Sequence, residues 1–452
     1  MKSEEFATAI KFVVIGITDN PNPWFPPEVL EIIKQGKVFS GGKRHHEIIA
    51  PLLPTDAEWI DITAPLDTVF EKYSSLFTLH SSLSILHSSL SIVVFASGDP
   101  LFFGFANTIQ RKLPDAEIQL FPTFNSLQML AHRLVMPYHD MRIVSLTGRP
   151  WQEFDRALIE RAPKIGVLTD KEHTPTAIAQ RMIEYGYTYY NMSVGEHLGN
   201  PEKEKVTKLT LEEAARAEFS MPNCIILDSP PALPIREGAV TLGRNHADAC
   251  SVHSAPSLIG RAGGKSALFG IPDSSFALLD GREKMITKMP IRLLTLQALD
   301  LPKRHVLWDI GFCTGSVSIE ARLLFPHLDI HAFEIRPECE AIIQKNVRRF
   351  GAPGINVHIG DFLETDISSL PRPDAVFIGG HGGYLKAIMM KVLTVLAPDG
   401  IIVMNSVKAP KVTTDSHQLW DEACQELGLQ QESPTKIILN DNHPIEILKA
   451  HQ

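Results

Sequence analysis

The sequence has few cysteines, no long apolar run and no excess of basic residues. Its 452 residues include five cysteines, none of them in a C-x-x-C pair, so neither a disulfide framework nor a zinc knuckle is indicated and a reducing cytosol fits. No stretch approaches the roughly 20 apolar residues that span a bilayer. The formal net charge of -9 argues against a nucleic-acid partner and leaves small acidic or neutral ligands open.

What is present is the composition of an ordinary globular protein, 44% hydrophobic and 21% charged. The chain exceeds the size at which a single hydrophobic core usually stops growing, so two or three domains are expected. Strand-like and helix-like segments alternate toward both ends, a pattern typical of α/β domains with mainly parallel sheets. We expect the six-residue apolar run FVVIGI near the start to be the first strand.

A central segment interrupts this alternation. From Ser229 to about Lys265 the sequence has no sustained period and is rich in Pro, Gly, Ser and Ala. We therefore predict two domains, residues 1–230 and 269–452, joined by a linker over residues 231–268.

Two other features are not expected to carry chemistry. His246, Cys250 and His253 have spacings that a metal ion can use, but a connector of this composition is more often simply solvated, so we expect no metal site. The heptapeptide LHSSLSI stands at 79–85 and again at 86–92. Seven residues are close to two helical turns, so we interpret the second copy as a tolerated duplication that keeps the apolar face nearly in phase.

The stretch VLWDIGFCTGSVSIEA, residues 306–321, predicts a buried strand, a tight turn and a helix that starts at Ser316. Backbone N–H groups at such a helix start attract negative or oxygen-rich ligand groups, and glycine lets a ligand approach the main chain closely. About twenty residues after Gly315, the strand DIHAFE ends in Glu334, the usual place of an acid that binds both ribose hydroxyls. A nucleoside is therefore the expected ligand.

The details of this region favour one nucleoside in particular. The pattern D-x-G-x-x-x-G that begins at Asp309 is commoner around S-adenosylmethionine, which has no pyrophosphate to cradle, than the dinucleotide pattern G-x-G-x-x-G. Asp361 and Phe362 follow a third strand, where an acid and a ring commonly hold adenine. The segments TKIILN and HPIEILKA predict a terminal hairpin, which favours a methyltransferase sheet over a dehydrogenase sheet. An α/β domain with an idle glycine turn is the alternative.

In the N-terminal half, three glycine-containing loops follow apolar strands: SGGKRHHE at 40–47, ASGDPLFFG at 96–104 and SLTGR at 145–149. The Ser-Gly-Asp-Pro sequence predicts a sharp turn that exposes backbone groups and one carboxylate. Together with FPTFNS and VGEHLGNP, these loops resemble the tetrapyrrole methylase family. The resemblance implies that S-adenosylmethionine lies between two small α/β lobes.

The two halves together resemble the family of bifunctional precorrin-6Y C5,15-methyltransferases (decarboxylating) of cobalamin biosynthesis. The motifs that carry this resemblance follow the family order: GGKRH, ASGDPLFFG, GEHLG, FGIPDSSF, ITKMPIR, WDIGFCTGSVSIE and FIGGHGG. It implies an α/β protein with an N-terminal, two-lobed tetrapyrrole methylase domain (class III) that methylates C5. A C-terminal, Rossmann-like class I methyltransferase domain with a seven-stranded, mainly parallel sheet would methylate C15 and decarboxylate.

The resemblance also implies which residues bind S-adenosyl-L-methionine, whose demethylated product is S-adenosyl-L-homocysteine. In the C-terminal domain these are Thr287, Asp309, Gly311, Phe312, Cys313, Thr314, Gly315, Glu334, Asp361 and Phe362. In the N-terminal domain they are Ser97, Gly98, Asp99, Pro100, Leu101, Asn125, Ser126 and Leu146.

Several positions depart from the family pattern. The first loop reads VIGITDNPNP where the family prefers G-x-G-P-G, so cofactor contact from that loop is left open. FPTFNS replaces the usual P-G-x-S-S, and TGR stands where HGR is frequent. Phe312 and Cys313 replace smaller residues. None of these changes removes a side chain that the chemistry requires.

The expected reaction needs alignment and exclusion of water more than strong acid-base groups, because a sulfonium methyl is already activated and a corrinoid meso carbon is already nucleophilic. A conjugated macrocycle can also accept the electrons that decarboxylation releases. Its acetate and propionate arms call for cations, and the candidates are Lys43, Arg44, His45, Arg149, Lys288 and Arg292. As catalytic candidates we name His381, Asp99 and Arg292. The alternatives are a solvated cation, a structural loop histidine and an aspartate that serves only its turn.

Two other functions are weighed against this one. An RNA or protein methyltransferase with an accessory domain is disfavoured, because the fourth strand ends in IGGHGG and not in an N-P-P-Y type motif. A corrinoid- or nucleoside-binding protein without turnover is the other alternative. The leading hypothesis implies a cytoplasmic enzyme that acts on a precorrin or cobalt-precorrin, binds no nucleic acid or membrane, and forms a homo-oligomer.

Overall fold

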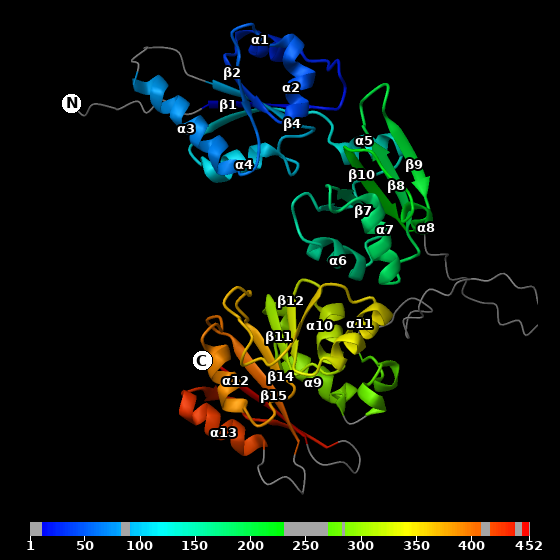
Figure 1. Ribbon diagram of the computed structural model, residues 1–452, viewed down its shortest axis with the longest axis vertical. Helices are drawn as coiled ribbons and strands as arrows, with labels where there is room; N and C mark the ends of the chain where they lie inside the picture. Colours follow the sequence, from blue (N-terminus) through cyan, green and yellow to red (C-terminus); the bar gives the residue numbers. More distant parts are fainter. Residues whose placement is uncertain are drawn as a thin grey trace, which may run out of the picture. The chain divides into compact units, whose positions relative to one another are not determined.

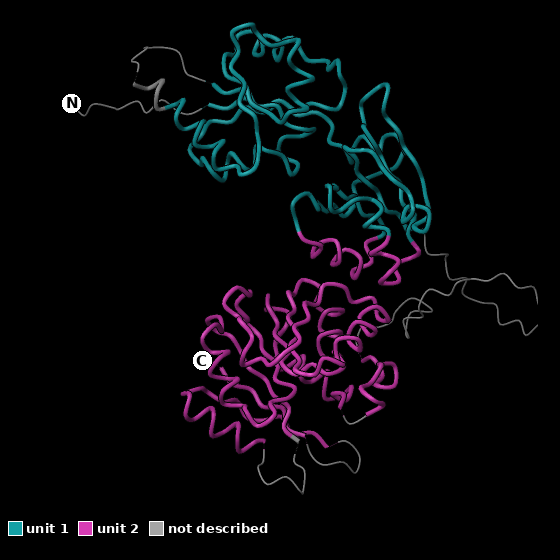
Figure 2. Tube along the Cα trace, in the orientation of Figure 1, with its two compact units in different colours: residues 1–149, 163–179, 190–229 teal, residues 150–162, 180–189, 230–452 magenta. Residues whose placement is uncertain are grey.

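The computed structural model describes residues 11–82, 91–229, 270–282, 285–407, 416–438 and 445–451. The predicted linker with His246, Cys250 and His253 lies outside these residues, and so does part of each LHSSLSI copy. Contacts divide the chain into two compact units (Figure 2). Unit 1 consists of residues 1–149, 163–179 and 190–229, and unit 2 of residues 150–162, 180–189 and 230–452.

The first sheet of unit 1 is wholly parallel, with the order β3-β2-β4-β1-β5. Its strands are β1 Lys11–Ile17, β2 Val38–Gly41, β3 Glu58–Asp61, β4 Ser91–Ser97 and β5 Glu117–Phe121. The predicted first strand, FVVIGI, is confirmed as part of β1, which begins one residue earlier at Lys11. The helices are α1 Pro27–Gln35, α2 Lys43–Ile49, α3 Leu66–Ser82 and α4 Phe105–Lys112, with a 3-10 turn at Ala50–Leu52.

These helices cover both faces of the sheet, as Figure 1 shows. Alternate residues of β1 enter two different cores: Phe12 and Val14 pack with residues of α3 and α4, and Val13 and Ile15 pack with residues of α1 and α2. Burial on both faces explains why this strand is a continuous apolar run.

The second sheet of unit 1 has the order β6-β7-β10-β8-β9, and only its β6–β7 pair is parallel. Its strands are β6 Arg142–Ser145, β7 Lys164–Leu168, β8 Asn191–Glu196, β9 Lys205–Leu209 and β10 Asn223–Asp228. The helices of this region are α5 Ser126–Leu134, α6 Gln152–Ile159, α7 Pro175–Glu184 and α8 Leu211–Ala214. The contact division assigns α6, and α7 from residue 180, to unit 2.

The sheet of unit 2 follows the order β13-β12-β11-β14-β15-β18-β16, with β17 paired to β18. Its strands are β11 Val306–Ile310, β12 Asp329–Glu334, β13 Ile355–Ile359, β14 Ala375–Ile378, β15 Ile401–Val407, β16 Gln430–Gln431, β17 Thr435–Ile437 and β18 Ile445–His451. The described sheet thus has eight strands, one more than the predicted seven, because the short β16 and β17 each pair with part of β18. The antiparallel β17–β18 pair confirms the predicted terminal hairpin.

Helices cover both faces of this sheet as well (Figure 1). They are α9 Met289–Ala298, α10 Ser316–Leu324, α11 Glu338–Phe350, α12 Leu385–Leu393 and α13 Ser416–Leu427, and 3-10 turns lie at Asp273–Ser275, Leu279–Gly281 and Leu301–Lys303. One core joins Trp308 of β11 to α12 and α13, and another joins Leu307 to α9 and α10. In the part of the chain that the structure describes, no helix is both long enough and apolar enough to cross a bilayer.

Candidate functional site

The loops that follow β11, β12, β13 and β14 meet at one edge of the sheet of unit 2, because these strands are parallel neighbours. Hydrogen bonds tie the loops together: Gly311 N–H donates to the Phe333 carbonyl at 2.8 Å, and Gly360 N–H donates to the Glu334 carbonyl at 2.9 Å. The predicted strand, glycine turn and helix are confirmed at residues 306–324. The structure therefore brings most of the predicted nucleoside contacts of this half to one place.

Asp309 is the penultimate residue of β11 and is buried, with 1% of its surface exposed. Its Oδ2 accepts a hydrogen bond from the Ser318 hydroxyl at 2.6 Å, whereas its Oδ1 is buried without a partner among the described residues. Burial raises the pKa of Asp309 to about 7, although the hydrogen bonds from Ser318 lower it in part. An unsatisfied buried acceptor is costly, so this oxygen is suited to a ligand donor.

Glu334, the predicted ribose acid, is fully occupied by protein donors. Its Oε2 accepts from the Cys313 N–H and from Arg336 Nη2, both at 2.9 Å. Its Oε1 accepts from Arg336 Nε at 2.9 Å and from the Arg336 N–H at 3.2 Å. A carboxylate offers about four lone-pair sites, so ribose hydroxyls can bind here only if the Arg336 guanidinium moves away.

The glycine loop leaves no room for a side chain at Gly311. This residue has φ +82°, and a Cβ atom there would lie 2.7 Å from the Gly380 nitrogen. The loop after β14 therefore packs directly against the loop after β11 and brings His381 beside it. His381 Nδ1 accepts from the Gly383 N–H at 3.2 Å, which leaves the ring proton on Nε2, and burial lowers the pKa of this histidine. His381 is thus a neutral hydrogen-bond donor next to the glycine loop.

The predicted adenine edge has only one exposed member. Asp361 is exposed, and its Oδ1 accepts from the Leu363 N–H at 2.9 Å. Phe362 is 6% exposed and packs edge-on against Trp308 and Phe333. The Lys391 ammonium donates to the carbonyl oxygens of residues 362, 363 and 365 and so fixes this turn. Sequence reasoning missed Lys391, which lies on α12.

The other residues of the glycine loop are largely covered. Phe312 and Cys313 are 5% and 6% exposed, within a core that also includes Cys339. Thr314 is 1% exposed, and its hydroxyl oxygen is buried without a partner among the described residues. The unpartnered Asp309 and Thr314 oxygens and the close loop packing fit an adenosine-bearing cofactor, with Glu334 available once Arg336 is displaced.

Arg292 does not lie where a substrate contact would require it. The side chain has no exposed surface, pairs with the buried Glu320, and donates to the Thr287 carbonyl at 2.7 Å and to Asp273 at 3.2 Å. The predicted substrate and catalytic roles therefore find no support in this arrangement, in which Arg292 anchors the segment before α9. Lys288 is half-exposed and 3.8 Å from Asp273, and Thr287 is partly buried.

Unit 1 contains a cavity of about 490 Å³ between residues of its two sheets. Its walls include Ser97, Gly98, Asn125 and Ser126, as predicted, together with Arg44 and His45. Gly98 has φ +64°, and a Cβ atom there would lie 2.8 Å from the Asn125 Cα, so the loops after β4 and β5 are in direct backbone contact. The structure thus places half of the predicted cofactor residues of this domain on the cavity wall.

Arg44, His45 and Ser97 form one hydrogen-bonded group on the cavity wall. The Ser97 hydroxyl oxygen accepts from Arg44 Nη2 and pairs with His45 Nε2, both at 2.9 Å. His45 Nδ1 accepts from the Gly42 N–H at 3.3 Å, so the ring proton lies on Nε2. Burial, followed by the charge of Arg44, lowers the pKa of His45 to about 4. With both lone pairs of Ser97 used, its hydroxyl proton is available to a ligand acceptor.

Asp19 and His197 were missed by sequence reasoning. Asp19 lines the cavity, lies 3.3 Å from Arg44 Nη1 and accepts from His197 Nδ1 at 2.9 Å. Asp19 belongs to the loop that departs from the family pattern, and His197 lies in the GEHLG loop. Their sequence separation of 178 explains why no local pattern reveals the pair.

The remaining predicted residues of unit 1 lie around this cavity with different exposure. Asp99 Oδ1 accepts the Leu101 N–H at 2.9 Å, so its carboxylate supports its own turn. Leu146 is fully buried, and the neighbouring Thr147 lines the cavity instead. Pro100 is buried, whereas Leu101, Lys43 and Arg149 are exposed. Among the described residues, no group of three or more His, Cys, Asp or Glu is arranged to hold a metal.

Comparisons with known proteins match both halves of the chain. Residues 11–215 match the family model described as tetrapyrrole (corrin/porphyrin) methylases, and residues 280–434 match the precorrin methyltransferase domain. A precorrin-6Y C(5,15)-methyltransferase [decarboxylating] from a Sinorhizobium species is 30% identical over 87% of this chain and 84% of its own length.

Two Salmonella typhimurium proteins match one part each. A cobalt-precorrin-6B C(15)-methyltransferase (decarboxylating) is 37% identical over 28% of this chain and 66% of its own length. A cobalt-precorrin-7 C(5)-methyltransferase is 26% identical over 48% of this chain and 98% of its own length.

The fold, the two sites and these matches define the chain as an S-adenosylmethionine-dependent methyltransferase with two methyltransferase domain types. It belongs to the family of decarboxylating precorrin-6Y C5,15-methyltransferases of cobalamin biosynthesis.

Proposed function

We propose that this enzyme methylates C5 and C15 of precorrin-6Y, or of the corresponding cobalt-precorrins, and removes the carboxyl group of the ring C acetate. The observation that carries this proposal is the presence, on one chain, of a two-lobed cleft in unit 1 and a strand-end glycine loop in unit 2. The C5-methylating domain would span residues 1–230 and the C15-methylating domain residues 269–452, with residues 231–268 between them. The contact division differs from these bounds, because it assigns residues 150–162 and 180–189 to unit 2. The domain bounds are therefore part of the proposal.

In the C-terminal domain, the unpartnered Asp309 and Thr314 oxygens would accept donors of the cofactor, and Glu334 would accept the ribose hydroxyls. Asp361 would meet the adenine edge, while Phe362 supports it from the core. When bound, S-adenosylmethionine supplies a methyl group that its sulfonium already activates. The packed loops at Gly311 and Gly380 would hold this methyl in line and exclude water, which supplies much of the rate by proximity.

Decarboxylation requires a proton where the carboxyl group leaves. Loss of carbon dioxide sends an electron pair into the conjugated ring, and the acetate carbon becomes a methyl group only when a proton reaches it. His381 lies beside the glycine loop, and we assign this delivery to it. Because a neutral imidazole does not give up its only ring proton, His381 would first take up a second proton from solvent and then donate it as an imidazolium. Lys288, half-exposed at the start of α9, would pair with an acetate or propionate arm.

In the N-terminal domain, Ser97, Gly98, Asn125 and Ser126 would line the cofactor cleft, with Asp99, Pro100 and Leu101 shaping its turn. Arg44, His45, Lys43 and Arg149 would supply donors to the carboxylates of the ring. Arg44 is already oriented by Asp19, so its position on the wall is set before a ligand arrives.

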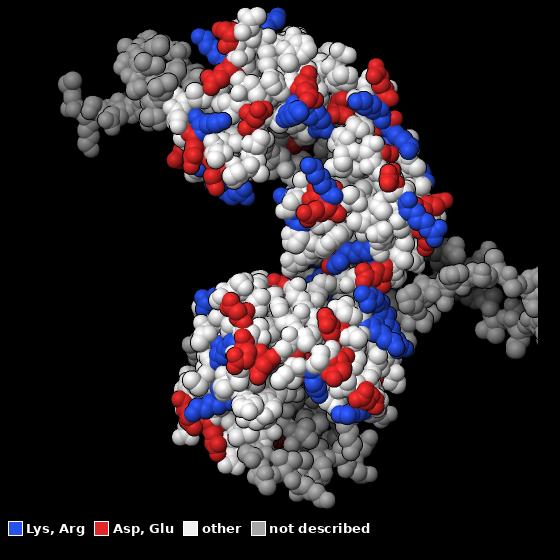
Figure 3. Space-filling model, in the orientation of Figure 1, with Lys and Arg blue, Asp and Glu red and all other residues white. Residues whose placement is uncertain are grey.

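The setting of the enzyme follows from its substrate and surface. We propose that it acts in the cytoplasm as a homo-oligomer and binds neither nucleic acid nor membranes. On the face that Figure 3 shows, Lys and Arg side chains are interspersed with Asp and Glu, unlike the continuous basic stripe of many nucleic-acid-binding proteins.

The test is product analysis with the purified full-length chain, precorrin-6Y or its cobalt form, and S-adenosylmethionine labelled in the methyl group. Mass spectrometry is expected to show two labelled methyl groups and the loss of one carbon dioxide. Methylation of RNA or protein, or binding without turnover, would contradict the proposal. A product with one methyl group and no loss of carbon dioxide would show that only the N-terminal domain is active.

A further inference from the structure

Two phenylalanine side chains line the cavity of unit 1 and are still exposed. Phe103 follows β4 and is 45% exposed, and Phe124 precedes α5 and is 57% exposed. Single exposed apolar residues are ordinary on a protein surface. Two exposed rings on one concave wall indicate a ligand site instead, because ligand pockets are typically lined by apolar and aromatic side chains.

The backbone fixes Phe103 in this exposed position. Its φ is 53°, in the left-handed region that bulky residues rarely adopt and that is found at functional sites. The preceding Phe102 packs against the core under α5, and the two rings meet edge to face at 5.3 Å. Both rings therefore line the cavity, with Phe102 partly buried against this core and Phe103 exposed beside it.

Phe124 is supported from behind by other rings. Its centroid lies 5.0 Å from that of His132 in an edge-on arrangement, and His132 contacts Tyr138 at 5.8 Å. Such edge-to-face contacts are favourable and restrict the ring. Phe124 is therefore held by this row of rings while 57% of the residue stays exposed.

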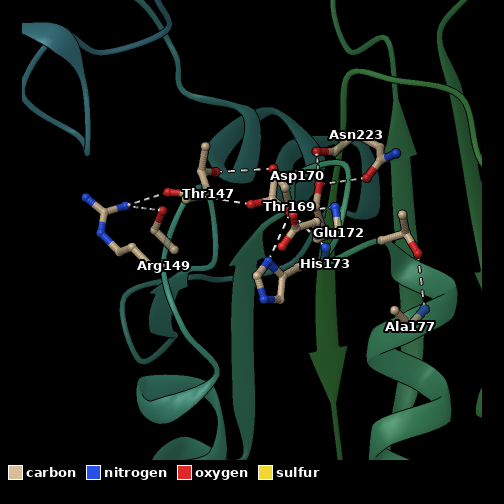
Figure 4. Close-up of polar contacts among 11 residues, drawn as sticks. Thr147, Arg149, Thr169, Asp170, Glu172, His173, Ala177 and Asn223 are labelled. Carbon is tan, nitrogen blue, oxygen red and sulfur yellow. Dashed lines mark hydrogen bonds and ion pairs between the residues drawn. The ribbon is translucent and has the colours of Figure 1, made fainter. Parts of the chain in front are cut away.

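A cation lies over one face of the first ring. The Arg149 guanidinium carbon is 5.2 Å from the Phe103 centroid, and Nη1 donates to the Ser145 hydroxyl at 2.7 Å. Figure 4 shows the other guanidinium nitrogens of Arg149 pointing away from Thr147, whose carbonyl oxygen accepts from Nη1 at 3.5 Å. These nitrogens face away from the protein contacts that the structure assigns to the residue, and the side chain is exposed.

The loop that carries Arg149 is itself anchored. Gly148 N–H donates to Asp170 Oδ2 at 2.8 Å, and Asp170 Oδ1 accepts the His173 N–H at 2.7 Å (Figure 4). Burial alone would raise the pKa of Asp170, but the N–H donors of His173, Gly148 and Glu172 lower it to about 2. The carboxylate is therefore charged at neutral pH and orders the loop.

We propose that Phe103 and Phe124 form an apolar platform for the face of the tetrapyrrole ring in the C5 site, and that Arg149 pairs with one of the ring's carboxylate arms. The ligand class is a conjugated macrocycle that bears acetate and propionate groups. Aromatic side chains stack on such a face, and arginine binds carboxylates with two parallel hydrogen bonds. This inference rests on the proposed function and names the ring-binding surface of its N-terminal site.

The first test is an equilibrium titration of the full-length protein with uroporphyrin I, a porphyrin with eight carboxylates. Phe103→Ala and Phe124→Ala should each weaken binding roughly tenfold, the loss expected for one aromatic contact with its buried area. Arg149→Met should weaken binding at low salt and reduce its salt dependence. Trp24→Ala and Arg111→Met are matched controls in unit 1, since Trp24 is 82% exposed and neither residue lines the cavity.

The second test compares the two reactions of one chain. In Phe103→Ala, Phe124→Ala and the milder Phe103→Leu, the KM for the precorrin should rise in C5 methylation, with the KM for S-adenosylmethionine and the C15 reaction unchanged. Wild-type affinity for uroporphyrin I in both alanine variants, or no binding of this ring by the wild-type protein, would overturn the platform. Failure of the proposed function has a separate signature, the absence of labelled methyl transfer to any tetrapyrrole by the wild-type chain.

Discussion

The two candidate cofactor sites differ in how they treat charge. In unit 2, the carboxylates of Asp309 and Glu334 are almost fully buried, and one oxygen of Asp309 has no partner among the described residues. In unit 1, the cavity wall is built from backbone, hydroxyl groups and charges that already neutralise each other, such as Arg44 and Asp19. A single cofactor can therefore be recognised by buried carboxylates in one site and by an open cleft of hydroxyl groups and paired charges in the other. The two sites should respond differently to mutation and to pH.

The largest effect is expected when a side chain is added to the glycine loop of unit 2. Gly311→Val places a branched side chain at φ +82°, where a Cβ alone would lie 2.7 Å from the Gly380 nitrogen. The loops must then separate, and C15 methylation should fall by more than about 100-fold, since small misplacements at a reacting centre cost that much. C5 methylation of the same chain should be unchanged, as measured by product mass.

The matched variant is Gly98→Val, in which the Cβ would lie 2.8 Å from the Asn125 Cα. It should abolish C5 methylation and leave C15 methylation intact when each of the two reactions is supplied with its own ring substrate. Equal loss of both activities in either folded variant would contradict separate cofactor sites.

Asp309→Asn should distinguish the buried-anion site from the cleft. The Asn side chain retains the shape but loses the charge, and one charge-assisted hydrogen bond is worth enough that C15 methylation should fall roughly 50-fold. C5 methylation should not change. Ser318→Ala is the matched variant, since it removes the donor to Asp309 Oδ2 and leaves the carboxylate in place.

The same substitution should change the pH dependence of stability. Burial raises the folded-state pKa of Asp309 to about 7, so between the unfolded value near 4 and pH 7 the folded protein binds the extra proton and stability falls as pH rises. The Asp309→Asn variant has no carboxyl group to deprotonate, so its stability does not fall in this way as pH rises. Its free energy of unfolding relative to wild type should therefore increase between pH 4 and pH 8, by up to about 4 kcal/mol, in denaturant titrations. A constant difference across this range would show that Asp309 is charged at all these pH values.

The sequence was sufficient for the elements of unit 2 because each step there is local. An apolar run, a glycine turn and a helix start identify residues 306–324, and DIHAFE coincides with β12. Arg292 could not be placed in this way. A basic residue in a glycine-containing neighbourhood suggests an exposed side chain. Arg292 is buried instead, because Glu320, 28 residues later, supplies the opposite charge that offsets the cost of burying the guanidinium.

In unit 1, too, local features could be predicted from the sequence and contacts between distant residues could not. The Ser-Gly-Asp-Pro turn was predictable from four adjacent residues, and the structure has it. The link between Asp19 and His197 joins loops of different sheets, and Leu146 is buried where Thr147 is exposed to the cavity. Which of two neighbouring side chains faces a cavity depends on the packing of the whole lobe, and the sequence pattern does not specify it.

Arg336→Met should have a smaller effect than the preceding variants, and it should strengthen ligand binding where they weaken activity. The substitution removes the two guanidinium donors from Glu334 and leaves its lone pairs to the ribose. Binding of S-adenosylhomocysteine to the C-terminal site should tighten roughly tenfold, because the ligand no longer displaces a charge-assisted pair. Calorimetry in a Gly98→Val background isolates this site. Lys345→Met, an exposed charge loss on α11, is the control, and equal affinity in both variants would refute the competition.

The smallest effect is expected at Ser97. Its hydroxyl oxygen accepts from Arg44 and His45, and its own proton is the group left for a ligand, so Ser97→Ala removes one neutral hydrogen bond. The kcat/KM of C5 methylation should fall about 3- to 10-fold with C15 methylation unchanged, and Ser91→Ala at the other end of β4 should have no effect. Because burial and the charge of Arg44 lower the pKa of His45 to about 4, this ring is neutral from pH 5.5 to 8.5 and the loss should be constant over that range. A loss that grows as pH falls would mean that His45 gains a proton in the cleft, and the neutral character that separates this site from the one in unit 2 would be wrong.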